Sequence, residues 1–239
     1  MPANEDGRRT LIACALVATW WAGPSQRRLF SSVEINENNY RRWMDGVVHS
    51  ESKTHLEYVR SLWHSFGYLD IEPKCRVRNL AQDSGEYLSA LHNLRSLTLN
   101  NIDFEHIRGE EFHTCFSAFR ETLTHLTLDT FTTSFSTLVT FVDYFPNIIS
   151  LELDPAAMRP DEGPVPSLSQ PLRGKLHVHE VGNDCLELLD RFATLDLEYE
   201  GLIIDSPPRF AVEEFVESSL RISQRTVKFL KLTAEISCK

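Results

Sequence analysis

The sequence lacks the features of a secreted or disulfide-stabilised protein. Its five cysteines are odd in number and far apart, and no two of them form a Cys-x-x-Cys pair. This pattern excludes a disulfide framework and the ligand spacing of a zinc ribbon. No Asn-x-Ser or Asn-x-Thr acceptor for glycosylation occurs either. We therefore predict an intracellular protein, cytoplasmic or nuclear, with reduced thiols.

Basic residues are also in deficit. The chain has 24 lysines and arginines against 34 acidic residues, for a net charge of −10. A nucleic-acid-binding surface must neutralise phosphates, so this balance argues against one. The charge is uneven, because residues 1–42 carry +2 and the remainder carries −12. Two parts with different surfaces are therefore expected.

No hydrophobic run is long enough to span a bilayer, which takes about 20 apolar residues. The longest candidate, residues 11–23, has the length of a signal-peptide core. However, Trp20 and Trp21 occupy positions where small residues should precede a cleavage site. We therefore predict no membrane association, and secretion after cleavage near Ala22 is a remote alternative.

The same segment is predicted to form a helix that is apolar on two faces. At about 100° per residue, Leu11 and Trp21 fall on one face, and Leu16 and Trp20 fall on another. Such a helix must be buried on two sides, one of them against a partner. We expect it to end soon after Gly23, since a proline follows.

The stretch CALVATWWAGPSQRRLFSSVEI, residues 14–35, resembles the second half of an F-box as found in fungal F-box proteins. The matching residues are Cys14, Ala15, Leu16, Val17 and Trp21 in the helix, and Leu29, Phe30, Ser32, Val33 and Ile35 after it. The resemblance implies binding to the small adaptor subunit of an SCF-type cullin-RING ubiquitin ligase. The partner-binding residues would be Leu11, Leu16, Val17, Trp20 and Trp21.

The sequence departs from the family at the start of the motif. An F-box normally opens with an L-P-x-E-[IL] helix, and no such motif precedes residue 14. Part of the expected adaptor surface is therefore missing. Three interpretations remain open: a truncated gene model, a fragment of a longer protein, or a degenerate F-box that no longer binds.

An internal repeat runs through the rest of the chain. Each copy ends in two leucines, or similar residues, at alternate positions. The copies are VRSLWH (59–64), LRSLTL (94–99), LTHLTL (123–128), IISLEL (148–153), RGKLHV (173–178), FATLDL (192–197) and VKFLKL (227–232). From Leu97 onward the central leucines are 29, 25, 25, 19 and 35 residues apart, near the period of leucine-rich repeats. Stacked strands of this kind would form a parallel sheet with a continuous core.

Amphipathic helices are predicted between the strands, because apolar residues recur there at intervals of three and four. They cover residues 112–123, 135–145, 186–193 and 212–220. The predicted fold class is α/β, with an irregular leucine-rich-repeat solenoid of parallel strands and outer helices. The predicted domains are a partial F-box-like helical module at 1–35, a connecting helix at 36–58, and the repeats at 59–239 with a proline-rich loop at 155–171.

Catalytic motifs are missing. The chain has no glycine-rich nucleotide loop, no Walker loop, no G-x-S-x-G and no H-E-x-x-H. His177 and His179 would share one face of a strand, as a metal site needs, but the sequence suggests no further ligand. We therefore predict no catalytic residue, no cofactor and no metal, and expect a protein that is not an enzyme.

Two functions follow. In the first, the chain is a substrate-recognition adaptor that binds the ligase adaptor through its F-box-like helix and a target protein through its repeats. In the alternative, it is a non-catalytic leucine-rich-repeat interaction module, in which the F-box-like helix only covers the end of the first repeat. The target protein is not identified by either hypothesis.

Overall fold

A single parallel sheet organises the chain. The computed structural model describes residues 19–36, 38–48, 53–65, 85–104, 109–161, 164, 166–179, 183–192, 194–195, 197–205 and 228–233. Within them, eight strands form one sheet in which spatial order equals chain order and every pair is parallel. The strands are β1 (Ser32–Ile35), β2 (Ser61–Ser65), β3 (Ser96–Asn100), β4 (His125–Ser134), β5 (Ser150–Arg159), β6 (Leu172–Val178), β7 (Leu197–Asp205) and β8 (Phe229–Thr233). The predicted α/β class with a parallel sheet is confirmed.

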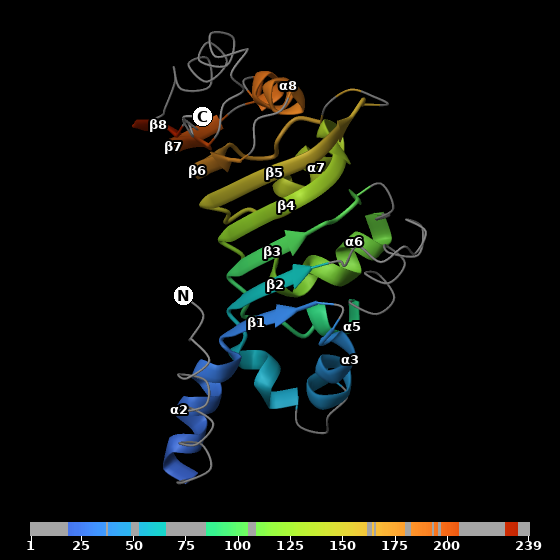
Figure 1. Ribbon diagram of the computed structural model, residues 1–239, viewed down its shortest axis with the longest axis vertical. Helices are drawn as coiled ribbons and strands as arrows, with labels where there is room; N and C mark the ends of the chain where they lie inside the picture. The colour runs from blue at the N-terminus through green and yellow to red at the C-terminus, as the bar shows by residue number, and fades with distance from the viewer. Residues whose placement is uncertain are drawn as a thin grey trace, which may run out of the picture.

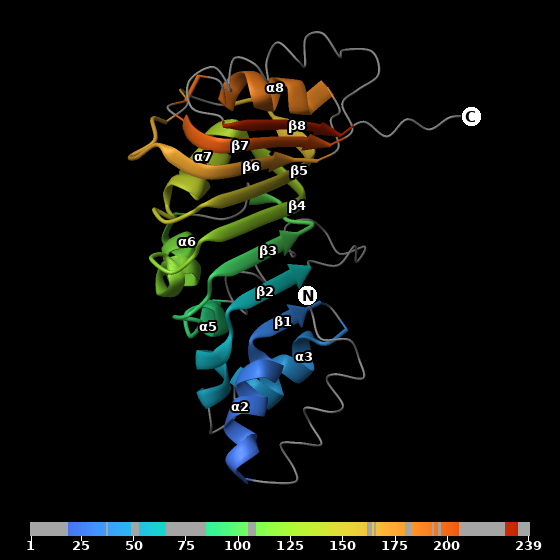
Figure 2. The same cartoon turned by 90° about the vertical axis from the view of Figure 1, so that its left-hand side faces the viewer.

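Helical segments connect the strands. Figures 1 and 2 show three of them, α5 (Gly85–Leu88), α6 (Gly109–Phe116) and α7 (Phe135–Asp143), on the same side of the sheet. The helical segments are α2 (Thr19–Phe30), α3 (Tyr40–Trp43), η1 (Met44–Val48), η2 (Lys53–Tyr58), α5 (Gly85–Leu88), α6 (Gly109–Phe116), η5 (Ser117–Phe119), α7 (Phe135–Asp143) and α8 (Asn183–Phe192). Those predicted near 112–123, 135–145 and 186–193 are confirmed as α6 with η5, α7 and α8. The one predicted at 212–220 lies outside the described residues.

The core is built from two rows of side chains on the face that the helices cover. Alternate residues of a strand point to the same face, so each L-x-L pair sends both of its leucines inward. The first row is Val33, Leu62, Leu97, Leu126, Leu151, Leu176 and Leu202, and all are buried. Phenylalanines from the helices, among them Phe116, Phe119 and Phe141, belong to the same buried core and contact one another edge to face.

One predicted repeat copy is wrong. The sequence suggested FATLDL (192–197) as a strand, but the residue that pairs with Leu176 is Leu202, in EGLIID (200–205). The pair that enters the core is Leu202 and Ile204. Because α8 extends to Phe192, Leu195 falls in the connection before β7. The last two spacings become 26 and 28 residues instead of 19 and 35, so the repeat is more regular than predicted.

The predicted boundary after residue 35 does not separate helices from sheet. The segment SVEI, assigned to the helical part, is β1 and pairs in register with β2. In addition, α2 continues through Pro24 to Phe30, although we expected the helix to end there. Gly23 has no Cβ to clash with the proline ring, and Pro24 is exposed, so water can reach the carbonyl that lacks a donor.

The single connecting helix predicted at 36–58 is found only in part. α3 continues directly into η1, so residues 40–48 are helical, and η2 follows as a separate segment. Before Tyr40, asparagine side chains accept hydrogen bonds from the backbone. The Asn36 N–H donates to Oδ1 of Asn39, and the Asn38 N–H donates to Oδ1 of Asn36. The resulting turn delays the helix until Tyr40.

The predicted loop at 155–171 is shorter than expected, because residues 155–159 belong to β5. They pair with the end of β4, beyond a bulge at Thr130. Pro155 is accommodated where the register shifts.

Next along the chain, the Asp161 carboxylate accepts from the Ser136 N–H, at the start of α7, and pairs with Arg191 of α8. Burial acts to raise the pKa of Asp161, but these two partners outweigh it and lower the pKa.

Gly174 in β6 is required by its surroundings. Its φ of +89° is in the region that favours glycine, and a Cβ there would lie 2.1 Å from the Ile149 carbonyl oxygen. We expect Gly174→Ala to lower the free energy of unfolding by at least about 2 kcal/mol, as measured by urea denaturation. Gly46→Ala is the matched control, because no atom lies within 4 Å of the added Cβ. Equal effects of the two changes would contradict this prediction.

His64 is a buried histidine in a row that otherwise holds apolar residues. It pairs with Leu99 across the sheet, and the Tyr87 hydroxyl lies 2.6 Å from its Nδ1. Burial lowers the pKa of His64 from 6.5 to about 3. The folded protein therefore keeps His64 neutral while the unfolded chain takes up a proton between these two values. Its contribution to stability is complete above pH 6.5 and is lost as the pH falls toward 3.

We expect His64 to add about 1.4 kcal/mol per pH unit to the loss of stability below pH 6. Urea denaturation at several pH values between 7 and 4 measures this slope. His64→Leu should make the slope shallower, whereas His92→Gln, at an exposed position, should leave it unchanged. The same slope in wild type and His64→Leu would show that burial does not suppress protonation of His64.

Candidate binding face of the sheet

The face of the sheet opposite the helices carries a different set of side chains, which we call the open face. The residue between the two inward positions of each strand points to this face. Strand register aligns these residues in one row across the sheet: Glu34, Trp63, Thr98, Thr127, Glu152, His177, Ile203 and Lys231. The row is polar over most of its length, which is the opposite of the leucine rows on the covered face.

A neighbouring row of the open face is held by side-chain hydrogen bonds. The Ser65 hydroxyl donates to Oδ1 of Asn100 at 2.9 Å, and the Asn100 amide donates to Oδ2 of Asp129 at 2.6 Å. The ladder therefore links β2, β3 and β4 at their carboxyl ends. Their polar groups are held in fixed positions, so this part of the face is ordered before any ligand arrives.

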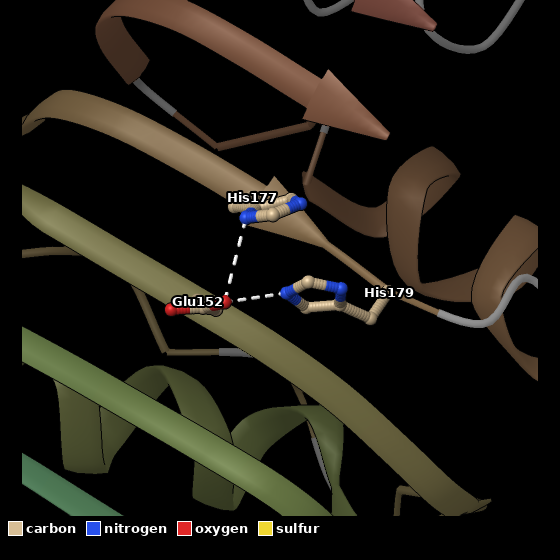
Figure 3. A group of neighbouring side chains, drawn as sticks. All are labelled: Glu152, His177 and His179. Carbon is tan, nitrogen blue, oxygen red and sulfur yellow. Dashed lines mark hydrogen bonds and ion pairs between the residues drawn. The ribbon is translucent and has the colours of Figure 1, made fainter. Parts of the chain in front are cut away.

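Three side chains meet farther along the open face, on β5 and β6. Figure 3 shows Glu152 of β5 with its carboxylate directed at His177 of β6 and at His179, which follows β6. Oε1 of Glu152 lies 3.4 Å from Nδ1 of His177 and 2.5 Å from Nε2 of His179. The two imidazole rings lie beside each other, with centroids 3.8 Å apart. Between 24% and 37% of each side chain is exposed, so solvent reaches the cluster.

Other contacts hold this cluster in place. The Thr127 hydroxyl donates to Oε2 of Glu152 at 3.2 Å, which leaves Oε1 facing the histidines. The backbone N–H of His179 donates to the Leu153 carbonyl at 2.8 Å and fixes the residue beside β5. One carboxylate and two imidazoles with converging donor atoms can bind a cation or accept hydrogen bonds from a partner.

Sequence analysis found the two histidines but missed Glu152. The signal was present in the repeats, since Glu152 and His177 occupy the same position in SLEL and KLHV, between the two inward residues. Equivalent positions of successive parallel strands are neighbours. Aligning the copies by their central leucines would therefore have placed the carboxylate next to His177.

The residues predicted to bind the ligase adaptor are placed only in part. Leu11, Leu16 and Val17 lie outside the described residues. Trp20 and Trp21 belong to α2, and their side chains also lie outside what the structure describes. The structure therefore brings none of the five together into a described surface, and their role stays a prediction.

The carboxyl end of α2 is attached to the segment before β2. The Phe30 ring stacks on His55 of η2, with ring centroids 4.5 Å apart. The Arg27 guanidinium lies 5.7 Å from the centre of the Tyr58 ring. The first helix and the sheet are thus connected by packing as well as by the chain.

The chain was compared with protein-family models, with curated proteins and with solved structures, and nothing matches it. Among the described helices, none combines the length and the apolar character needed to cross a membrane.

Proposed function

We propose that the chain is a target-recognition adaptor of an SCF-type cullin-RING ubiquitin ligase. In this proposal α2 and the residues before it bind the small adaptor subunit of the ligase, and the repeats form a leucine-rich solenoid that binds a target protein inside the cell. Ubiquitin transfer would be carried out by other subunits, so the chain needs no catalytic residue.

The observation that supports this proposal is the direct connection between α2 and the sheet. The segment that resembles the F-box, residues 14–35, ends inside β1. One residue, Ser31, separates α2 from β1, and its hydroxyl donates to the Arg28 carbonyl at 2.9 Å. A connection this short has few free torsions, so the orientation of α2 fixes the orientation of the sheet and of its open face. A protein that must present a target to a ligase benefits from this geometry.

The open face is the surface that we assign to the target. It carries fixed polar groups, and its charge changes along the row from Glu34 on β1 to Lys231 on β8. A partner with the complementary arrangement of charges would be aligned along the strand order. The side chains at these positions define the charge pattern that a partner must complement, and we assign the partner by this chemistry alone.

The alternative is a non-catalytic leucine-rich-repeat interaction module with no ligase role. It is favoured by the position of α2 at the β1 end of the sheet, where a helix can shield an edge strand (Figure 1). In that case the apolar residues of the first helix pack against this chain and bind no adaptor.

A pull-down of the full purified chain with the small adaptor subunit of the cullin ligase tests the proposal. We expect the wild type to bind, and a Leu16→Asp, Trp21→Ala double variant to lose at least tenfold in affinity, about what one central interface residue contributes. His92→Gln changes an exposed residue outside α2 and should bind like wild type. Circular dichroism establishes first that each chain is folded.

Failure of the folded wild type to bind the adaptor would reject the ligase role and leave the interaction module. Binding that survives unchanged in the double variant would reject the assignment of the site to the first helix.

A further inference from the structure

The group formed by Glu152, His177 and His179, which we call the Glu152 cluster, has the composition of a metal site. Two imidazoles and one carboxylate form a common protein ligand set for zinc, and in such sites a water molecule completes the tetrahedron. The donor atoms of Glu152, His177 and His179 all lie within 4.8 Å of one another. Glu152 and His177 lie on two adjacent strands of a regular sheet, which is a more rigid support than a loop, and His179 directly follows the second strand.

Two of the three separations between donor atoms can be compared with those around a zinc ion. Zinc ligands about 2.0–2.2 Å from the metal in a tetrahedron lie about 3.3–3.6 Å from each other. Oε1 of Glu152 and Nδ1 of His177 are already 3.4 Å apart. Oε1 and Nε2 of His179 are at hydrogen-bond distance, 2.5 Å, so a zinc ion would replace this contact and move the two atoms apart by less than about 1 Å. His179 lies directly beyond the last residue of β6.

The contacts around the cluster support the same conclusion. The Thr127 hydroxyl holds the second oxygen of the carboxylate, which is the kind of outer contact that orients metal ligands. Solvent reaches all three side chains, so a metal ion and a water ligand can enter.

We propose that Glu152, His177 and His179 bind one zinc ion on the open face, with water as the fourth ligand in the isolated chain. Zinc is favoured over magnesium or calcium because those ions prefer all-oxygen ligand sets. It is favoured over iron(II) because sites with nitrogen and oxygen ligands bind zinc more tightly than iron(II) in the general affinity order of divalent metals. This inference concerns the chain alone and does not depend on a ligase role.

Titration of the metal-free full chain with zinc, in competition with a chromophoric zinc indicator, tests the proposal. We expect one zinc ion per chain and no competition from magnesium. His177→Ala, His179→Ala and Glu152→Gln should each weaken zinc binding at least about tenfold, since even outer contacts of a metal site contribute that much. His125→Ala is the matched control, because His125 is exposed on the same face outside the cluster.

Cobalt(II) substitution adds an independent readout, since a tetrahedral site gives intense visible absorption. Glu152→Gln keeps the size of the side chain and its contact with Thr127, so it tests the site even if an alanine variant fails to fold. Equal zinc affinity in wild type and all three cluster variants would overturn the proposal. So would the absence of stoichiometric zinc binding, or a cobalt spectrum of octahedral type. None of these results depends on the adaptor pull-down, so the two proposals can fail separately.

Discussion

The burial of paired apolar residues between a parallel sheet and its helices is the constraint on which the rest of the structure depends. Each L-x-L pair places two side chains on the covered face, and a single strand has nothing to bury them against. In-register pairing from β1 to β8 joins these pairs into continuous rows. Replacing one buried leucine of this kind by alanine typically costs about 2–5 kcal/mol, a large share of the stability of a domain.

The same constraint explains why the polar residues are found where they are. Alternation along a strand sends every second side chain away from the core, so the open face receives whatever residues lie between the leucines. His64 is one exception, because it lies in an inward row. There it has the Tyr87 hydroxyl as a partner, which satisfies a polar group that would otherwise destabilise the core.

Elements with strong periodicity were predictable from the sequence, and elements set by context were not. Apolar residues at intervals of three and four identified α7, and LTLN and LTLD identified β3 and the start of β4. FATLDL alternates apolar and polar residues as the correctly predicted strands do. The strand nevertheless pairs through Leu202, because α8 extends to Phe192 and the pairing residues come later in the chain. SVEI was assigned to the helical module because it belongs to the segment that resembles an F-box, although its apolar residues alternate as in a strand. Glu152 escaped detection because it is distant in sequence from His177 and His179 and meets them only through strand register.

The strands lie in the sheet in the same order as in the chain, and this order affects which sequence changes the structure can accept. Each strand touches only the strands before and after it, so a change of length in one connection is absorbed locally and leaves distant repeats undisturbed. Substitutions at Thr98, Thr127, Glu152 or His177 alter the chemistry of the open face without entering the leucine rows. The chemistry of the open face can therefore change position by position while the leucine rows that support the sheet stay the same.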